Sequence, residues 1–396
     1  MDPYLNDWLD LLFRWLHVVA GIVWIGTSFY FVALDSHLRP PRDRRREEEG
    51  VGGETWEIHG GGFYRIEKYR VAPATLPEPL HWFKWEAYTT WLTGFALLIV
   101  VYYVDADVNL VDRSVADLSE AEAIGLSIGL LVGAWAVYDG LCRLLAGRPR
   151  VLAVAILAAI AASAYATHEL FGARAAYLEV GAMLGTIMVA NVFFVIIPAH
   201  WALIRAKEAG RDPDARHGIL GKQRSVHNNY LTLGVVFTMI STHFPVLYGN
   251  EHSWEALVAL IAIGAWIRLF FNLRHRGETH YWILVSAGAA ILVLALLIKP
   301  DEPKAGAAPV VAFERVQQVV TERCAPCHSQ TPTNPAVSAP PLGIELDSPD
   351  EIAARADAIE QQAVLSRSMP PGNVTGMTDE ERDLLAAWIA AGAPTR

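Results

Sequence analysis

Two thiols and an imidazole stand close together near the end of the chain, in the run Cys324-Ala325-Pro326-Cys327-His328. The C-x-x-C-H spacing is the attachment signature of a c-type haem, in which both cysteines form thioethers and the histidine ligates the iron. The spacing therefore predicts a haem c held covalently by Cys324 and Cys327, with His328 as one axial ligand. It also predicts that this region reaches a compartment in which c-type haem is assembled.

A C-x-x-C pair has two other common uses, in zinc sites and in thioredoxin-like redox motifs. A zinc site needs further cysteine or histidine ligands nearby, and the remaining cysteine, Cys142, lies far upstream beside an apolar run. A thioredoxin-like motif is expected within a βαβ pattern, which this sequence does not have. Both alternatives are therefore weaker than the haem interpretation.

The second axial ligand of the iron is expected downstream of His328. Met369 lies in a proline-braced loop, Ser368-Met369-Pro370-Pro371-Gly372, and a methionine ligand raises the potential of a cytochrome c. Met377 is the alternative, but it directly precedes Thr378, which has the pattern of a helix N-cap with Glu381 three residues later. We therefore predict His328 and Met369 as the two iron ligands.

Amphipathic helices are predicted at both ends of this region, over residues 311–323 and 379–391. Terminal helices of this kind commonly cross in small c-type cytochromes. Residues 311–396 are therefore expected to form a small helical class I cytochrome c domain.

The chain before residue 299 is far more apolar. Over all 396 residues, 53% are hydrophobic and the mean hydropathy is +0.26, which is high for a soluble protein. Apolar runs recur at about the 20 residues that a bilayer-spanning helix requires. We predict eight spans, at residues 8–34, 81–104, 123–145, 151–168, 175–204, 226–248, 254–271 and 281–298.

The predicted fold class is thus all-α, a polytopic membrane bundle of about eight transmembrane helices followed by the cytochrome domain. The membrane domain is assigned to residues 1–298, a linker rich in Pro, Ala and Gly to 299–310, and the cytochrome domain to 311–396. The acidic N-terminus does not resemble a cleavable signal peptide, so the first helix is expected to act as an uncleaved signal.

Basic residues in the connections predict the orientation. Nineteen Lys or Arg follow the odd-numbered spans, whereas the N-terminus and the connections after the second, fourth and sixth spans carry only Arg113 and Arg174. Positive charge marks the cytoplasmic side of a membrane protein. The N-terminus and the cytochrome domain are therefore predicted on the periplasmic side of the inner membrane of a Gram-negative cell, where haem c is attached.

Histidines in the predicted spans form two layers, and an ionisable side chain at membrane depth indicates a functional site. His17 and His243 are predicted near the periplasmic side, and His81, His200 and His227 near the cytoplasmic side. Two layers are typical of a membrane cytochrome b, so one or two b-type haems are a hypothesis. His17 and His243 are the predicted outer ligands, and the inner ligands stay open among the other three. Histidines at helix ends that contact both water and lipid are the competing interpretation.

The first cytoplasmic connection has three successive glycines at 60–62, followed by Tyr64, Arg65 and Lys68. Such glycines allow either a close approach of the backbone to a ligand or a tight β-turn. Aromatic and basic side chains beside them suit a planar anion. A pocket on this side would also draw on the polar residues that begin the sixth span, Gln223, Arg224, His227, Asn228 and Asn229.

Four segments resemble the membrane-bound bacterial urate oxidases of the PuuD type. They are Trp15-Leu16-His17-Val18-Val19-Ala20-Gly21-Ile22-Val23-Trp24-Ile25-Gly26, residues 59–69, Leu80-His81-Trp82-Phe83-Lys84-Trp85-Glu86-Ala87 and Val226-His227-Asn228-Asn229-Tyr230-Leu231-Thr232-Leu233. The resemblance extends over the whole chain, because the membrane domain and the C-terminal cytochrome also follow in the same order. The first helix is more weakly similar to haem-binding membrane proteins of the HemJ type, which favours His17 as a ligand.

The resemblance implies oxidation of urate to 5-hydroxyisourate, with electrons leaving through the cytochrome and no need to form hydrogen peroxide. Urate, a planar anion, is then expected near the cytoplasmic face, with its charge held by Arg65, Lys68 or Arg224. A base, Glu86 or His227, would remove a proton before water adds at C5. Further substrate contacts are expected from Tyr64, Gln223, Asn228 and Asn229.

The implied partners are urate, the lipid bilayer and a respiratory-chain electron acceptor, either a cytochrome c or a terminal oxidase. No nucleic acid is expected, and a homo-oligomer is left open. Two other functions stay as alternatives. The chain could be a quinol-linked cytochrome subunit without a small-molecule substrate, or a permease with a redox sensor attached.

Overall fold

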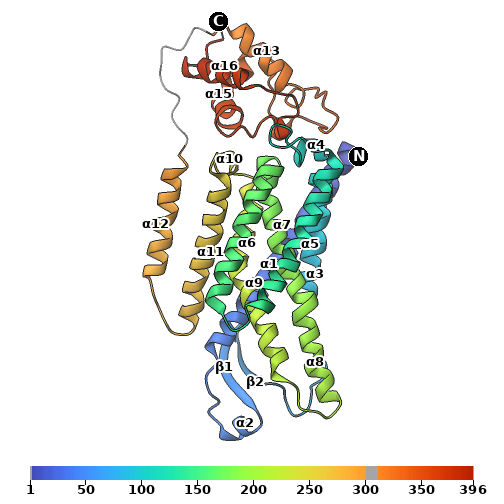
Figure 1. Ribbon diagram of the computed structural model, residues 1–396, viewed down its shortest axis with the longest axis vertical. Helices are drawn as coiled ribbons and strands as arrows, with labels where there is room; N and C mark the ends of the chain where they lie inside the picture. Colours follow the sequence, from blue (N-terminus) through green and yellow to red (C-terminus); the bar gives the residue numbers. More distant parts are fainter. Residues whose placement is uncertain (1, 300–310, 396) are drawn as a thin grey trace.

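The computed structural model describes residues 2–299 and 311–395, so the predicted linker lies outside the described residues except for Lys299. This part of the chain is mostly helical and contains one two-stranded sheet. The long helices before residue 299 run side by side in an elongated bundle (Figure 1). The helices of residues 311–395 gather at one end of this bundle, near the N-terminus, and the β-hairpin extends from the other end (Figure 1).

Helices occupy all eight segments that were predicted as spans. They are α1 (Pro3–His37), α3 and the π-helix η1 (Trp85–Leu97, Leu98–Tyr103), α5 (Glu120–Leu144), α6 (Pro149–Leu170), α7, the π-helix η2 and α8 (Ala173–Ala190, Asn191–Ile196, Ile197–Glu208), α9 (Ala215–Ser241), α11 (Ser253–His275) and α12 (Trp282–Leu297). Among the described residues, five helices are long and apolar enough to cross a membrane: α1, α5, α6, the continuous α7–α8 and α11. They are compatible with a membrane protein, and the count of eight spans stays a prediction.

Two predicted spans extend beyond the helices that the structure has, α3 and α9. In each case a histidine that was predicted inside the span lies outside the helix. His81 is exposed in the irregular segment before α3, which begins only at Trp85. His243 is exposed in a turn after α9, which ends at Ser241. The second boundary follows from Pro245, because a residue that precedes proline disfavours the helical conformation and Phe244 is indeed non-helical.

The core of the bundle surrounds α7, and α1 lies at its edge. In the most apolar stretch of each helix, 67% of residues are buried in α7–α8 but only 11% in α1. Tyr177, Val180, Met183 and Leu184 of α7 pack into one apolar cluster with residues of α5, α6, α9 and α11. A helix that is apolar on all sides belongs in such an interior, whereas α1 leaves a broad apolar face for lipid or another apolar surface.

The three glycines of the first connection form a tight turn. β1 (Val51–His59) and β2 (Gly62–Tyr69) are antiparallel, and His59 pairs with Gly62. Gly60 and Gly61 between them have φ values of +57° and +81°, which favour glycine because it has no Cβ. The short α2 (Arg44–Glu48) precedes this hairpin.

The C-terminal region has its own apolar core. The two predicted helices are confirmed as α13 (Phe313–Arg323) and α16 (Asp379–Ala390), which pack together with the rings of Phe313 and Trp388 6.0 Å apart. The predicted cap is confirmed too, since Thr378 and Glu381 form a capping box at the start of α16. Five short helices lie between them, η3 (Pro341–Gly343), α14 (Pro349–Ala354), α15 (Ala356–Ile359), η4 (Glu360–Leu365) and η5 (Pro371–Asn373).

The loop around Met369 faces the bundle. Helix η4 contacts α10 (Pro245–Tyr248), and η5 contacts α4 (Ala106–Asn109). Backbones meet closely at both places, because a Cβ atom on Gly249 would clash with Ser366 and one on Gly372 would clash with the Val111 carbonyl. Glycine at these positions therefore allows the C-terminal region to sit directly on the end of the bundle.

Candidate functional site

Arg224 stands at the centre of a polar cluster inside the bundle. It is 2% exposed on α9, and its Nη2 donates a hydrogen bond to Asp139 on α5 at 2.6 Å. Asp139 also accepts a 2.6 Å hydrogen bond from Arg143, one turn later on α5. Within the described residues, the Nε and Nη1 nitrogens of Arg224 are buried and have no hydrogen-bond partner. Because unpartnered buried donors are costly, they mark a place where a bound acceptor would be stabilised.

Tyr138 and His227 extend the cluster from Arg224. The Tyr138 hydroxyl lies 2.7 Å from His227 Nδ1, and the amide of Asn191 donates to the same hydroxyl at 3.1 Å. The tyrosine oxygen has two lone pairs, so it can accept from both Asn191 and the Nδ1–H of His227, which leaves the free lone pair of the imidazole on Nε2. The sulfur of Cys142 lies 3.9 Å from the same Nδ1.

Asn191 gives the cluster a free acceptor. It is fully buried at the first position of η2 and donates to Asn228 at 3.0 Å, while Asn228 donates to the Met188 carbonyl at 2.9 Å. Short π-helical turns inside α-helices often occur at functional sites. The Asn191 Oδ1 atom is buried without a donor. The cluster thus combines free donors on Arg224 with a free acceptor on Asn191.

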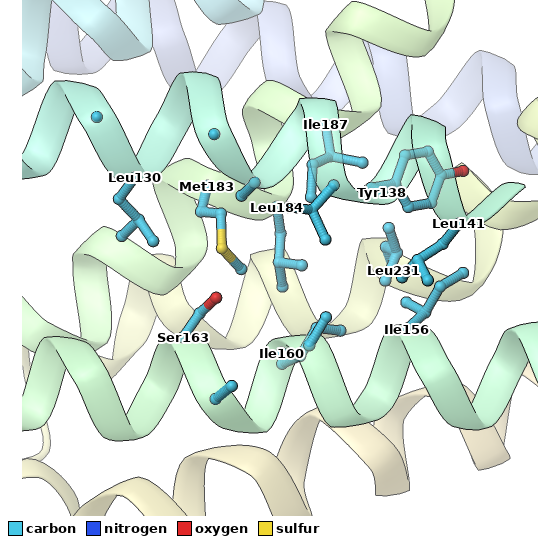
Figure 2. Close-up of a pocket in the computed structure, with 16 residues that line it drawn as sticks. Leu130, Tyr138, Leu141, Ile156, Ile160, Ser163, Met183, Leu184, Ile187 and Leu231 are labelled. Carbon is cyan, nitrogen blue, oxygen red and sulfur yellow. The ribbon is translucent and has the colours of Figure 1, made fainter.

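An apolar cavity of about 380 Å³ adjoins this cluster. Residues of α5, α6, α7 and α9 line it, including Leu130, Ile160, Met183 and Leu231 (Figure 2). Tyr138 lies at one end of the cavity with its hydroxyl turned away from the other lining side chains (Figure 2). The ring of Tyr138 therefore separates an apolar space from the polar cluster around Arg224.

The predicted cations of the hairpin lie elsewhere and have partners of their own. Arg65 pairs with Glu54 at 2.6 Å and with Glu67 at 3.0 Å, and Lys68 pairs with Asp35 at 2.5 Å. The Arg42 backbone N–H and the Arg65 guanidinium hold the pKa of Glu54 below its usual value. Arg65 is thus paired within the hairpin and Lys68 is paired with α1, and among the described residues no hydrogen bond or ion pair joins either cation to Arg224.

Three other predicted pocket residues have no hydrogen bond or ion pair with the cluster among the described residues. Tyr64 is exposed on β2, and Gln223 is half-buried on α9 beside Arg224 without a contact to the cluster. Glu86 lies in the first turn of α3, where its Oε2 atom is buried without a partner. Of the predicted pocket residues, only Arg224, His227 and Asn228 come together.

Residues 3–299 match the family model described as urate oxidase N-terminal. The chain belongs to the urate oxidase N-terminal family. Comparisons with curated proteins and with solved structures give no match. All residues of the Arg224 cluster lie within the matched range, whereas the C-x-x-C-H motif lies beyond it.

Among the predicted haem-ligating histidines of this urate oxidase family member, His17 has the most definite surroundings. Its Nδ1 lies 2.9 Å from the Thr90 carbonyl and 3.1 Å from the Thr93 hydroxyl, both on α3. Its ring packs so closely on Gly94 that a Cβ there would lie 2.8 Å from Cε1. A hydrogen bond from Nδ1 to a carbonyl leaves Nε2 with the lone pair, which is how ligating histidines are usually held.

The other predicted haem ligands are not paired with His17. His243 and His81 are exposed, and no hydrogen bond or ring contact joins either of them to His17 in the described chain. His200 on α8 lies beside Trp82, with 6.2 Å between ring centroids. Among the predicted haem ligands in the described chain, hydrogen bonds at Nδ1 therefore orient His17 and His227, and no hydrogen bond or ring contact joins any two of these histidines.

The C-x-x-C-H residues follow α13, outside the family match. His328 Nδ1 lies 3.1 Å from the Ile344 carbonyl, so its Nε2 is also free to ligate a metal. Among residues 2–299 and 311–395, no three His, Cys, Asp or Glu gather as a metal site. Burial raises the pKa of the Cys324 thiol to about 12, whereas a thioredoxin-like nucleophile requires a lowered pKa.

The two candidate methionines have different environments. Met377 is 3% exposed in the apolar core of the C-terminal region, and its backbone N–H is held by Asn373. Met369 is only partly buried, in the loop that faces the bundle. The thiols, the oriented His328 and the accessible Met369 fit the covalent attachment and axial ligation of a haem.

The sequence prediction missed Tyr138, Asp139 and Asn191 in the polar cluster. Each lies inside an apolar span, and an acidic or amide side chain there is a signal of function. The same rule finds Glu179 on α7, which is fully buried and accepts hydrogen bonds of 2.8 and 2.9 Å from Ser127. The prediction relied on the glycine-rich connection and on histidines, and neither signal includes these residues.

Proposed function

We propose that the chain is a membrane-bound urate oxidase that converts urate to 5-hydroxyisourate in its helical domain. The electrons would pass through a haem c on residues 311–395 to a cytochrome c or terminal oxidase of the respiratory chain. The polar cluster around Arg224 carries this proposal, because it is a buried site with both donor and acceptor capacity inside the family match.

Urate has carbonyl oxygens that accept hydrogen bonds and N–H groups that donate them. The Nε and Nη1 groups of Arg224 suit an oxygen of urate, and Asn191 Oδ1 suits one of its N–H groups. Asp139 already balances the charge of Arg224, so recognition would rest on this pattern of donors and acceptors as well as on charge. A fixed guanidinium would also stabilise negative charge that develops on the ring.

The reaction joins urate and water to give 5-hydroxyisourate, two protons and two electrons. His227 is the proposed base, because its imidazole is held by Tyr138 beside the free nitrogens of Arg224. It would receive a proton from urate or from the water that adds at C5. Tyr138 would keep the ring oriented and share the charge through its hydroxyl. Haem c, when bound, supplies one-electron acceptance and transfer.

The proposed location is the inner membrane, with the N-terminus and the cytochrome domain on the periplasmic side. The long apolar helices support a membrane protein. The N-terminus and residues 311–395 lie at the same end of the bundle, which supports this topology (Figure 1). The hairpin and its basic residues then lie in the cytoplasm, as the charge asymmetry predicts.

A b-type haem at His17 is a further part of the proposal. Its support is the hydrogen bond to Thr90, which leaves Nε2 available, and the close seat against Gly94. Reduced-minus-oxidised spectra of the purified chain and of His17→Ala test it directly. A b-type band that is lost in His17→Ala is the expected result, and the absence of this band from the unaltered chain would exclude the b-type haem.

The decisive experiment adds urate to the purified, detergent-solubilised chain under anaerobic conditions and follows the absorption of haem c. Urate should reduce the haem, and 5-hydroxyisourate should form at one molecule for every two electrons. Arg224→Lys keeps the positive charge but loses the planar fork, so it should raise KM for urate. Failure of urate to reduce the haem without air, together with formation of hydrogen peroxide from urate once air is admitted, would contradict the proposal.

One observation favours a second function. The apolar cavity beside Tyr138 suits a lipophilic molecule, which agrees with a quinol-linked electron-transfer subunit that has no small-molecule substrate. In that case a quinol analogue would reduce haem c and urate would not. The same anaerobic assay with each reductant separates the two functions.

A further inference from the structure

A second buried arginine, Arg268, lies on the face of α11 that meets α9. It is 5% exposed and donates from Nε to Asn229 at 3.2 Å and from Nη2 to Asn272 at 3.1 Å. Asn272 in turn donates to Asn229 at 3.0 Å. The guanidinium carbon lies 3.9 Å from the centre of the Phe29 ring on α1. Three helices therefore hold this group rigidly.

The charge of Arg268 has no counter-ion among the described residues. Arg224 pairs with Asp139, but no carboxylate lies within 4.0 Å of the Arg268 guanidinium in the described parts of the chain. Two neutral amides and an aromatic face partly replace water, yet a buried cation without a negative partner carries a high cost. A bound anion would remove that cost.

The unused hydrogen-bonding capacity here is on the donor side. The Nδ2 group of Asn229 is buried and has no partner, while its Oδ1 atom already accepts from both Arg268 and Asn272. The guanidinium has N–H groups beyond the two that bond Asn229 and Asn272. This pattern differs from the mixed pattern around Arg224. It suits a ligand made of acceptors, and it would leave the N–H groups of urate without an acceptor.

We propose that Arg268, Asn229 and Asn272 form a binding site for the phosphate group of an anionic ligand. Phosphate offers only acceptor oxygens and a full negative charge, and arginine binds it through two parallel hydrogen bonds. Arg268 lies about 10 Å along the axis of α11 from the last residue of that helix, His275. Arg274 and Arg276 at that end add positive charge that attracts anions. The phosphate comes from an anionic lipid or from free inorganic phosphate.

Thermal unfolding of the full-length chain in detergent tests the site without urate turnover. The probes are inorganic phosphate at constant ionic strength, and phosphatidylglycerol compared with diacylglycerol of the same chains. We expect phosphate or phosphatidylglycerol, but not diacylglycerol, to raise the unfolding temperature, because a ligand that binds the folded state stabilises it. A response to phosphate alone assigns the site to the free anion, and a response only to phosphatidylglycerol assigns it to lipid.

Arg268→Met should weaken the apparent affinity for the probe by about tenfold or more, since it removes charge-assisted hydrogen bonds. Arg276→Met is the matched control, because Arg276 is exposed at the end of the same helix and should keep the response. Asn229→Asp would place a carboxylate beside Arg268. We expect it to raise the unfolding temperature without ligand and to abolish the response, even if Arg268→Met fails to fold.

Three results would overturn the proposal. The first is that neither phosphate nor phosphatidylglycerol stabilises the unaltered chain. The second is that Asn229→Asp retains the full response. The third is an Arg268→Met variant that responds to the probes normally but has a raised KM for urate, which would assign Arg268 to the substrate. Failure of the urate oxidase proposal itself would leave the unfolding response unchanged, so the two outcomes are distinguishable.

Discussion

The C-terminal region and the helical bundle organise their polar residues in opposite ways. The residues predicted to attach haem c lie within five consecutive positions after α13 and depend on nothing distant for their spacing. The cluster around Arg224 takes Tyr138 and Asp139 from α5, Asn191 from η2 and Arg224 and His227 from α9. Covalent attachment needs local spacing, whereas recognition inside a bundle needs one or two side chains from each of several helices.

The largest expected effect concerns the closely spaced haem-attachment residues of the C-terminal region. The double variant Cys324→Ala and Cys327→Ala should lose covalent haem completely, because no thiol of the motif remains to form a thioether. Haem staining of the denatured chain and urate-driven electron delivery to an external acceptor measure this loss. Cys142→Ala is the matched control for attachment and should keep its haem. Staining that persists in the double variant would refute the haem assignment.

The same comparison explains how much could be predicted from the sequence. The C-x-x-C-H motif, the Thr378 cap and the apolar periods of the helices are local patterns, so they can be recognised before any contact is known. Helices occupy all eight predicted spans for this reason. The boundaries near His81 and His243 were less accurate. At His243 the cause is Pro245, because the residue before a proline disfavours the helix that apolar periodicity alone would continue.

The composition of the polar cluster could be predicted only in part. Arg224, His227 and Asn228 were found because they lie close together at the start of one apolar segment. Their partners Tyr138 and Asn191 lie on other helices, and no spacing in the sequence connects them with α9. The cations Arg65 and Lys68 looked available in sequence, but the fold gives them carboxylate partners. Charge pairing between distant segments is a property of the fold.

The second prediction tests whether the cluster in the bundle acts as one unit. Arg224→Gln should lower the free energy of unfolding by about 3 kcal/mol, because it removes the buried partner of the Asp139 carboxylate and leaves only the exposed Arg143. Adding Asp139→Asn should restore much of this stability but no urate oxidation, because the guanidinium donors are still missing. Denaturant unfolding and urate-driven haem reduction measure the two effects separately. Full activity in the double variant would show that Arg224 serves the fold alone.

A smaller effect is expected where the two regions meet. Gly249→Ala should weaken the docking of the C-terminal region by about 1–3 kcal/mol, because the added Cβ would clash with Ser366. The φ of Gly249 is −87°, so alanine is not strained by its own backbone. Urate should then reduce haem c more slowly in stopped-flow measurements, while ascorbate reduces it at the normal rate.

Gly125→Ala is the control for this substitution, because nothing lies within 4 Å of the position its Cβ would take on α5. Its reduction kinetics should match those of the unaltered chain with both reductants. An unchanged urate-driven rate in Gly249→Ala would mean that close contact at α10 does not govern electron transfer between the two regions.

The smallest expected effect concerns the hairpin, where the ion pair between Glu54 and Arg65 joins two neighbouring strands. Glu54 has a lowered pKa because the Arg42 N–H and the Arg65 guanidinium bind its carboxylate. A carboxyl group with a lowered folded-state pKa stabilises the fold at pH values above its unfolded pKa of about 4.3, and this stability is lost as the pH falls through the folded value. Hydrogen-exchange protection of β1 and β2 should therefore decrease between about pH 6 and about pH 3.

Glu54→Gln should remove most of that decrease while leaving the bundle helices unaffected, because Arg65 then has no ionised Glu54 to bind. An equal decrease in Glu54→Gln would assign the pH dependence to other carboxylates, of which Glu67 is the nearest candidate because it shares Arg65.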